Sequence, residues 1–351
     1  SGTVTASADD DGLWLWQAGA ASPRHAGPLT LVADLALTDQ DELRSALGAG
    51  PQADQADLVL AAWLRWGMEA PDYLNGSFAF ALWDRRTRCL TAVRDRFGIR
   101  PLAYALTPHG AILAGDLAPV LAGLDHEPDI EPAWVADFLS GTPLDMTSTA
   151  WNGVLRLPPG HMMTLNSDGI ATLRCWYRLQ ASAPPASGDA GPALRAALAH
   201  ATAQACAGQR TATMLSGGLD SSTLSLMSVQ DGEMVDPRPA LSLRYRDPAL
   251  DEGAYIDAVL QASGGRLAPV FLPGETQDED LFDLEAQLAW QDQPVFAPGL
   301  DRNHRLYRGA RDQNCGAVLD GHGGDEVIGG TFRDIALLAR GRDWPRALGL
   351  A

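Results

Sequence analysis

The chain has 351 residues, 46% of them hydrophobic and 20% charged, so it has the composition of a globular protein and is long enough for two domains. Its formal net charge is −18, its isoelectric point lies near 4.6, and it contains no lysine. A surface this acidic repels nucleic acid and anionic membranes, which excludes a general function in binding either of them.

The N-terminal segment, SGTVTASADDDG, has neither the basic nor the apolar region of a secretory signal. The longest aliphatic run near it, LVLAAWL at 58–64, is too short to span a bilayer. We therefore expect a cytoplasmic protein. The cysteines are spaced singly and indicate neither a metal site nor a disulfide framework. We expect four buried free thiols, at Cys89, Cys175, Cys206 and Cys315.

The first half of the chain consists of short apolar runs separated by turn residues. These runs predict strands at 12–16, 29–37, 77–84 and 110–116, and one helical pattern at 54–66 interrupts them. A stretch rich in Pro, Gly, Ser and Ala at 181–192 predicts a linker. We therefore expect a β-rich domain over residues 1–180.

After the linker, in residues 193–351, the pattern changes to short apolar runs that alternate with helical segments. The runs predict strands at 211–215, 240–245, 267–272 and 316–320. Alternation of strand and helix is typical of a parallel sheet that is covered on both faces. The second domain is therefore predicted to be α/β.

The stretch MLSGGLDSST at 214–223 follows the first of these strands and precedes a helix. Glycines let backbone N–H groups approach an anion, serine hydroxyls add donors, and a helix N-terminus adds partial positive charge. We interpret the stretch as a phosphate-binding loop. It is not the lysine-containing GxxxxGK[ST] loop, and the alternative is a glycine-rich turn with a serine N-cap.

At this point the sequence resembles a known family. SGGLDSS is similar to the pyrophosphate loop of AMP-forming ATP pyrophosphatases, and the second half resembles the synthetase domain of asparagine synthetase. The first half resembles that family's glutaminase domain, with the landmarks YLNGSFAFALWD at 73–84, RDRFGIRPL at 94–102 and GVLRLPPGH at 153–161. The resemblance implies a glutaminase-like Ntn sandwich, rich in β-structure, followed by a parallel α/β ATP-pyrophosphatase (PP-loop) domain.

A second glycine-rich stretch, LDGHGGDEVIGG at 319–330, follows the last predicted strand. In the family the corresponding loop faces the pyrophosphate loop across the ATP site, and one aspartate from each loop holds magnesium. The resemblance therefore implies ATP and Mg²⁺ as cofactors and Asp220 and Asp325 as metal ligands, which suits a hard cation. The residues implied to bind ATP are Leu215, Ser216, Gly217, Gly218, Leu219, Asp220, Ser221, Ser222, Gly321 and, less directly, Ser242. Asp251, Glu252 and Asp292 also match family positions, with a structural role as the alternative.

Glutamine-dependent members of the family begin with a cysteine, whereas this sequence begins with Ser1. LALTDQDEL at 35–43 stands near the place of the glutamine-holding segment, and Gly115 and Asp116 replace the usual Ser-Glu pair. We therefore expect a degenerate amidotransferase domain that does not hydrolyse glutamine. Ser1 acting as an N-terminal nucleophile is the alternative.

A synthetase without an ammonia supply needs another amine, and two branches of the family find one within the substrate. These branches are β-lactam synthetases and lasso peptide macrocyclases. GHGGDE, with His322 after the first glycine, resembles the macrocyclase loop. This implies that an Asp or Glu side chain of a lasso precursor peptide is adenylated and then attacked by the peptide's N-terminal amine, with His322 as the catalytic base.

The resemblance further implies a leader-binding protein and a leader peptidase as partners. The acidic composition argues against nucleic acid or a membrane as a partner. The family's synthetase domain normally continues beyond the second loop and carries a lysine there, so we expect residues 193–351 to be a partial domain. Three alternatives remain open: a β-lactam synthetase-like enzyme, a glutamine-dependent asparagine synthetase, and a non-catalytic scaffold that binds nucleotide or peptide.

Overall fold

In the computed structural model, the backbone is described for residues 4–8, 14–18, 23–108, 110–141, 145–180, 190–230, 236–275, 293–294 and 300–325. Side chains are described from residue 23 onward. The chain divides into an N-terminal unit, Ser1–Ala183 with Leu284–Phe296, and a C-terminal unit, Pro184–Asp283 with Ala297–Ala351. None of the described helices is both long and apolar enough to cross a membrane.

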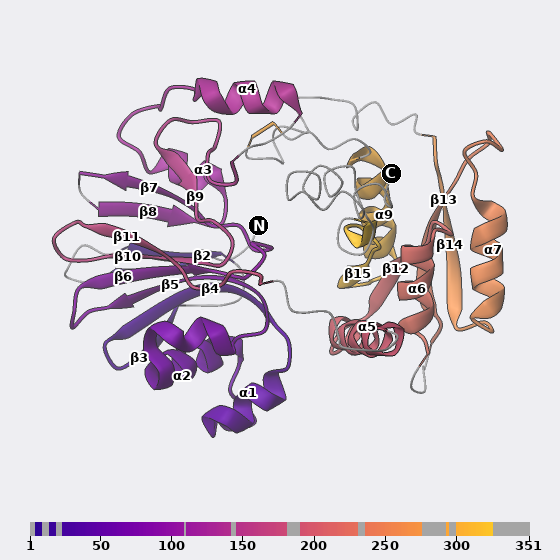
Figure 1. Ribbon diagram of the computed structural model, residues 1–351, viewed down its shortest axis with the longest axis horizontal. Coiled ribbons are helices and arrows are strands. Elements are labelled where there is room, and N and C mark those ends of the chain that lie inside the picture. Colours follow the sequence, from indigo (N-terminus) through magenta and orange to yellow (C-terminus); the bar gives the residue numbers. More distant parts are fainter. Residues whose placement is uncertain are drawn as a thin grey trace, which may run out of the picture. The chain divides into compact units, whose positions relative to one another are not determined.

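The N-terminal unit is built mainly from antiparallel strands (Figure 1). Its strands are β1 (Val4–Ala8), β2 (Trp14–Ala18), β3 (Arg24–Ala26), β4 (Leu29–Leu37), β5 (Gly76–Asp84), β6 (Cys89–Arg94), β7 (Ala103–Thr107), β8 (Gly110–Ala114), β9 (Val154–Arg156), β10 (His161–Leu165) and β11 (Ala171–Cys175). Its helices are α1 (Gln40–Leu47), α2 (Gln55–Trp66), the 3₁₀ helix η1 (Gly67–Tyr73), α3 (Leu117–Ala122) and α4 (Pro132–Ser140).

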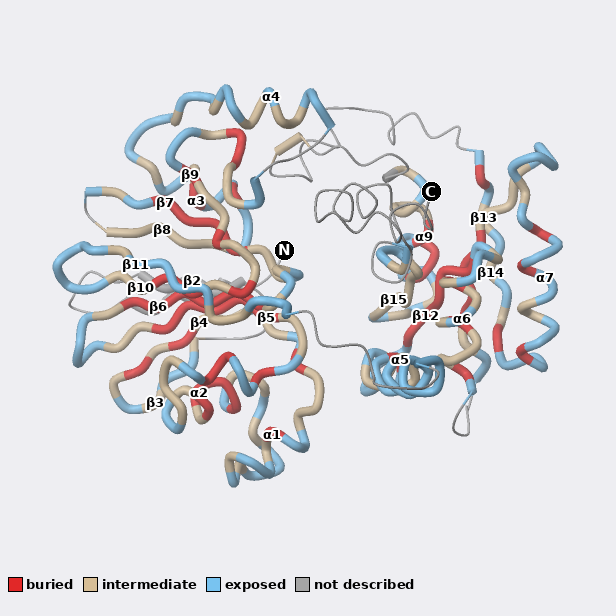
Figure 2. The backbone as a smooth tube through the Cα atoms, in the orientation of Figure 1, coloured by how far each residue is buried: buried red, intermediate tan, exposed pale blue. Residues whose placement is uncertain are grey.

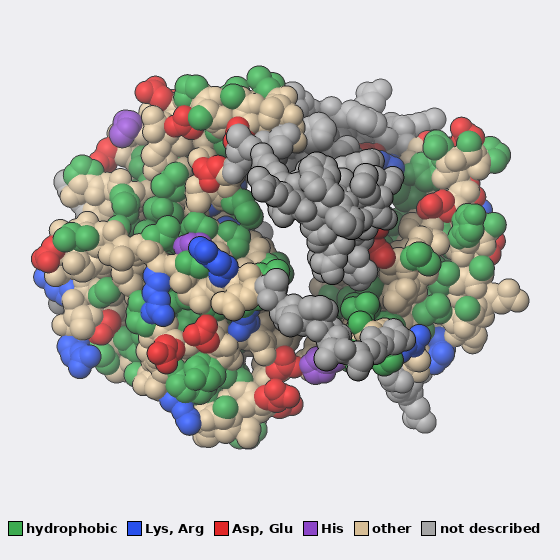
Figure 3. Space-filling model, in the orientation of Figure 1, with side chains coloured by type: hydrophobic (Ala, Val, Ile, Leu, Met, Phe, Trp, Pro, Cys, Tyr) green, Lys and Arg blue, Asp and Glu red, His purple; other side chains and the backbone are tan. Residues whose placement is uncertain are grey.

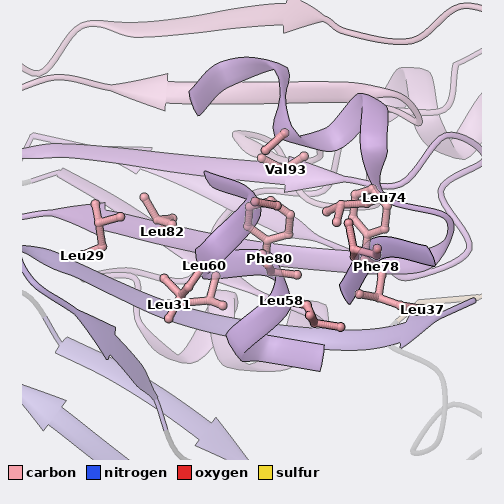
Figure 4. Packing of buried hydrophobic residues seen from close by; sticks show 14 of the residues in the cluster. Leu29, Leu31, Leu37, Leu58, Leu60, Leu74, Phe78, Phe80, Leu82 and Val93 are labelled. Carbon is pink, nitrogen blue, oxygen red and sulfur yellow. The ribbon is translucent and has the colours of Figure 1, made fainter. Parts of the chain in front are cut away.

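Two sheets and the helices packed on their outer faces form four layers: α1 and α2, the six-stranded sheet, the three-stranded sheet, and α3. The six-stranded sheet has the order β11-β10-β6-β5-β4-β3, and the three-stranded sheet has the order β8-β7-β9. Side chains alternate across β5, so Phe78, Phe80 and Leu82 face α2, as Figure 4 shows, whereas Ala79 faces the core shared with β7. A third apolar cluster joins the far face of β7 and β9 to α3. The predicted β-rich sandwich is therefore present.

The landmark at 94–102 has a structural explanation. Asp95 is 1% exposed, and its carboxylate accepts four backbone N–H groups, so a buried charge is fully paired. The donors are Phe78, Phe97, Ile99 and Arg100, at 2.9–3.3 Å. The guanidinium of Arg94 donates to the carbonyls of Gly98, Arg100 and Leu157 at 2.6–2.8 Å. The two side chains hold the turn between the two sheets.

The C-terminal unit is a parallel α/β fold. Its elements are α5 (Gly191–Cys206), β12 (Thr211–Met214), α6 (Leu219–Met227), β13 (Arg238–Arg244), α7 (Gly253–Ala262), β14 (Leu267–Pro273), α9 (Leu300–Asp312) and β15 (Ala317–Leu319). The sheet order is β14-β13-β12-β15, and all three strand pairs are parallel. α7, together with Val229 just after α6, contributes to the core on one face and α9 to the core on the other, which is visible as buried segments in Figure 2. The predicted parallel sheet, covered on both faces, is confirmed.

Two expectations from the sequence are corrected. Helix α5 begins at Gly191, inside the predicted linker 181–192, whose residues 181–189 lie outside the described part. The four cysteines are free, as expected, but none is buried, and Cys175 is exposed.

On the face of the N-terminal unit shown in Figure 3, arginine and acidic side chains are interspersed, without one extended basic patch among the described residues.

Candidate functional site

The candidate site lies at the carboxyl edge of the sheet in the C-terminal unit, where β12 and β15 are neighbours (Figure 1). From β12 the chain passes through β13 and β14 on one side and then returns to β15 on the other side. The strand order therefore reverses between β12 and β15. In open α/β sheets, such a switch point forms a crevice at the carboxyl ends of the strands, where ligands bind.

The first loop of the site is shorter than the sequence suggested. Only residues 215–218 connect β12 to α6, because the helix already begins at Leu219. Asp220, Ser221 and Ser222 therefore belong to the first turn of α6 and not to the preceding loop. At a helix N-terminus the first backbone N–H groups have no partner within the helix and carry partial positive charge. This position suits the binding of phosphate.

Hydrogen bonds within this loop fix its shape. The hydroxyl of Ser221 donates to the carbonyl of Gly218 at 3.2 Å and lies 3.0 Å from the hydroxyl of Ser216. It also accepts the Ser216 N–H at 3.3 Å. Gly217 has a φ of +86°, and a Cβ there would lie 2.6 Å from Cβ of Tyr255 on α7. Only glycine combines this left-handed backbone with so close an approach.

Ser222 differs from Ser221. Its hydroxyl oxygen is buried and has no hydrogen-bond partner among the described residues. Buried polar groups are normally paired, so this hydroxyl in the first turn of α6, like that of Ser225 one turn later, is a donor without a protein acceptor. The neighbouring Leu219 is 88% exposed, which leaves an apolar side chain beside the loop without cover from the protein.

The second loop, residues 320–325, packs directly against the first turn of α6. A Cβ on Gly321 would lie 2.9 Å from the backbone nitrogen of Ser221 and 3.0 Å from Cβ of Asp220. A Cβ on Gly324 would lie 2.6 Å from Cγ of Asp220. The two glycines therefore allow a contact that any larger residue would block, and this contact brings Asp220 against the residue that precedes Asp325.

The other predicted residues of the second loop are exposed. The side chain of His322 has a relative exposure of 66%, and Asp325 is exposed as well. His322 Nδ1 lies 3.4 Å from Oδ1 of Asp320. The sequence pattern assigned Asp320 to the last strand and gave it no role, yet it follows the last residue of β15 at the edge where the site lies.

The donor set fits the expected Mg²⁺ and ATP. Asp220 and Asp325 provide carboxylate oxygens, which are the ligands that Mg²⁺ prefers, and Mg²⁺ commonly takes only one or two of them from the protein. No group of three or more His, Cys, Asp or Glu side chains in the described part of the chain could hold a metal by itself. The N-terminus of α6 and the orphan hydroxyl of Ser222 match the oxygen acceptors of a phosphate group.

Ser242 is 2% exposed, and its hydroxyl donates to the carbonyl of Leu215 at 2.7 Å. The Leu215 N–H in turn donates to the carbonyl of Leu241 at 2.8 Å. These bonds join the ends of β12 and β13, so Ser242 holds the start of the first loop. A contact of Ser242 with adenine stays a prediction.

Asp251 has a structural role. Its carboxylate accepts two bonds at 2.9 Å from the guanidinium of Arg244 and one from the Tyr245 N–H, also at 2.9 Å. The hydrogen bonds from Arg244 lower the pKa of Asp251 to about 2. The pair ties the end of β13 to the segment before α7. Glu252 is the residue before α7, and its side chain does not cap the helix. Asp292 lies outside the described residues.

Of the positions singled out in the N-terminal unit, Ser1 lies outside the described residues. Residues 35–43 span the end of β4 and the start of α1, and Asp39 there has a φ of 52°. Gly115 and Asp116 connect β8 to α3. Nothing in this geometry tests glutamine hydrolysis, and the loss of that activity stays a prediction.

Comparison with known protein families finds a match for each half of the chain. Residues 35–177 match the glutamine amidotransferase domain, and residues 193–349 match asparagine synthase. The predicted order of folds is thereby confirmed: an Ntn amidotransferase-like domain precedes a PP-loop domain.

Individual relatives agree with these matches. The chain is 30% identical over 305 residues to a putative glutamine-hydrolysing asparagine synthetase of Mycobacterium bovis, which aligns 83% of this chain with 45% of the relative. It is 25% identical over 320 residues to asparagine synthetase 3 of Bacillus subtilis, with 86% and 51% of the two chains aligned. The chain thus spans about half the length of these relatives. Among solved structures, the glutamine phosphoribosylpyrophosphate amidotransferase of B. subtilis matches at 11% identity over 84% of this chain and 70% of that one, with a TM-score of 0.31, which is too low to support an inference.

Proposed function

The chain belongs to the asparagine synthetase family, and on this premise we propose that it is an ATP-dependent amide ligase that closes a macrolactam ring in a lasso precursor peptide. The observation that carries the proposal is the direct packing of the second glycine-rich loop against the first turn of α6 at the switch point of the sheet. The first loop leads into the N-terminus of α6, and the second carries His322.

In the first step, a side-chain carboxylate of the peptide attacks the α-phosphorus of ATP, and pyrophosphate leaves with the electrons of the broken P–O bond. The backbone N–H groups at the start of α6 and the hydroxyl of Ser222 would bind phosphate oxygens. Asp220 and Asp325 would hold Mg²⁺, which neutralises phosphate charge when bound.

In the second step, the peptide's N-terminal amine attacks the activated carbonyl carbon. A C–N bond forms, the C–O bond to AMP breaks, and AMP leaves with the electron pair. An α-amine has a pKa near 8, so it must lose a proton before it attacks at neutral pH. The imidazole of His322 would accept that proton, since a neutral imidazole nitrogen is a proton acceptor and this side chain is open to solvent.

The His322 position in the second loop supports macrolactam formation over the other branches of the family. As partners we propose the precursor peptide, a leader-binding protein and a leader peptidase. A second candidate is glutamine-dependent asparagine synthesis, because the similar proteins of B. subtilis and M. bovis are named glutamine-hydrolysing asparagine synthetases. A β-lactam synthetase-like reaction and a non-catalytic scaffold stay as weaker alternatives.

One experiment separates these functions. The full-length protein is incubated with ATP, Mg²⁺ and either the precursor peptide with its partners or aspartate and glutamine. Pyrophosphate and the products are then measured by mass spectrometry. Macrolactam formation predicts pyrophosphate release that depends on the peptide, together with a product that has lost one water. Asparagine formation would support the second candidate, and the absence of pyrophosphate in both mixtures would support the scaffold.

A further inference from the structure

The carboxylate of Asp320 contacts His322 in two ways. Its Oδ1 accepts the backbone N–H of His322 at 3.1 Å, and the same oxygen lies 3.4 Å from the ring nitrogen Nδ1. The side chain of Asp320 is 27% exposed, compared with 66% for His322. One oxygen of a partly buried carboxylate thus faces both the backbone and the ring of an exposed histidine.

A second element holds Asp320. Tyr307 lies on α9, which contacts β15, and its hydroxyl is hydrogen-bonded to the Asp320 side chain. Burial, and next the charge of Asp320 and this hydrogen bond, raise the pKa of Tyr307. The hydroxyl therefore keeps its proton at neutral pH and donates a hydrogen bond to the carboxylate. Asp320 is fixed from the helix side by Tyr307 and contacts His322 on the loop side.

We infer that Asp320 is a positioning residue that orients His322 for proton transfer, and that Tyr307 holds Asp320 in place. The inference rests on the proposed function and adds two residues to the site. Closing the 3.4 Å contact between Nδ1 and Asp320 into a hydrogen bond would hold the proton of the neutral ring on Nδ1. Nε2 then has a free lone pair. In the ring-closing step, the proton of the attacking amine moves to Nε2 while the C–N bond forms and AMP leaves.

The competing explanation is that Asp320 only stabilises the turn. Aspartate often accepts a backbone N–H two residues later, as it does here, and such turns need no catalytic purpose. That explanation does not account for the contacts of Asp320 with His322 Nδ1 and with Tyr307. The two explanations differ in what the negative charge does, because asparagine can form the same turn without a charge.

The test therefore uses Asp320→Asn, which keeps an oxygen acceptor for the His322 N–H. If Asp320 positions the base, ring closure slows by about tenfold or more. The loss is bounded by the ~10²- to 10⁴-fold that general-base catalysis is worth, because a positioning residue contributes no more than the base it orients. The KM values and ATP–pyrophosphate exchange stay at the parent level. Asp84→Asn is the matched control, since Asp84 forms a similar turn to the Arg86 N–H in the N-terminal unit.

Tyr307→Phe tests the outer contact, since it removes the hydroxyl and keeps the ring. We expect a smaller loss of ring closure in the same step. Ring closure at the parent rate in Asp320→Asn would overturn the positioning role while leaving the proposed function intact. A parent protein that releases no pyrophosphate with its peptide would instead contradict the proposed function.

A spectroscopic measurement tests the same inference without the peptide. ¹⁵N spectra of histidine-labelled protein, with His322 assigned by its loss in His322→Ala, report which ring nitrogen carries the proton. We expect His322 to be protonated on Nδ1 in the parent and to become a mixture of tautomers in Asp320→Asn. Identical His322 signals in the two proteins would show that Asp320 does not orient the ring, whether or not the peptide is cyclised.

Discussion

The carboxylate of Asp220 packs against Gly324, so the first turn of α6 touches the second loop one residue before Asp325. Because both strands are parallel neighbours and end at the same edge, Asp220 in the first turn of α6 and Asp325 in the second loop follow adjacent strand ends, although more than a hundred residues of sequence separate them. This contact gives the proposed metal pair its geometric basis.

Asp220→Asn and Asp325→Asn should each abolish adenylation without unfolding the protein. Each substitution removes one carboxylate from the proposed metal pair, and a metal supplies several kcal/mol of charge stabilisation at a phosphoryl group. ATP–pyrophosphate exchange should therefore fall by more than about 10³-fold. Circular dichroism monitors the fold of each variant. Exchange at the parent rate in either variant would remove that aspartate from the metal site.

Gly324→Ala should impair adenylation through sterics alone. The new Cβ would overlap the Asp220 carboxylate, which must then move. A misplacement of about 1 Å at a reacting centre can cost ~10²-fold in rate. We expect a loss of that order in pyrophosphate exchange and a higher Mg²⁺ requirement. Gly50→Ala is the matched control, because a Cβ at Gly50 meets nothing within 4 Å. Equal exchange rates in the two variants would mean that the loops do not pack as described.

Ser221→Ala should lower the stability of the protein, whereas Ser222→Ala should weaken ATP binding without lowering stability. The Ser221 hydroxyl bonds to both Ser216 and Gly218, so its loss should lower the free energy of unfolding by roughly 1–3 kcal/mol. The Ser222 hydroxyl is buried without a partner, so its removal should leave stability unchanged or raise it, while it weakens ATP binding. Denaturant melts and ATP titrations measure the two quantities. A clear loss of stability in Ser222→Ala would show that its hydroxyl is already paired without a ligand.

His322→Ala should separate the two chemical steps. General-base catalysis is typically worth ~10²- to 10⁴-fold, so ring closure should slow by that factor. Pyrophosphate exchange should persist, because the first step needs no proton acceptor at His322. Single-turnover assays that follow pyrophosphate and cyclic product separately measure this. If both steps failed together, or if neither changed, His322 would not be the base.

Asp251→Asn should lower the melting temperature at neutral pH, because it breaks the charged pair with Arg244. The hydrogen bonds from Arg244 hold the pKa of folded Asp251 at about 2, below its ordinary value of 3.8. A depressed pKa in the folded state contributes stability above the unfolded value, and this contribution is lost as the pH falls. The difference between parent and variant should therefore be constant above about pH 5 and shrink as the pH falls toward 2. A difference that did not depend on pH would contradict the pairing.

The sequence by itself predicted the order of the two folds and most strands of the C-terminal unit. It did so because buried parallel strands form short apolar runs between turn residues, and glycine-rich stretches after them mark tight loops. The helix at 54–66 and the strand at 29–37 were also close to α2 and β4. These features depend on local pattern, which a linear sequence carries.

Other features were decided by tertiary structure. The sequence placed Asp220 to Ser222 in a loop, whereas α6 already begins at Leu219. The close approach of Gly217 to Tyr255 on α7, and of Gly321 and Gly324 to Asp220, exists only in the folded chain. The different states of Ser221 and Ser222 depend on which neighbours reach each hydroxyl. The contacts of Asp320 with His322 and Tyr307 arise only when β15 and α9 pack together. Contacts between residues distant in sequence leave no local pattern, so only the folded chain decides them.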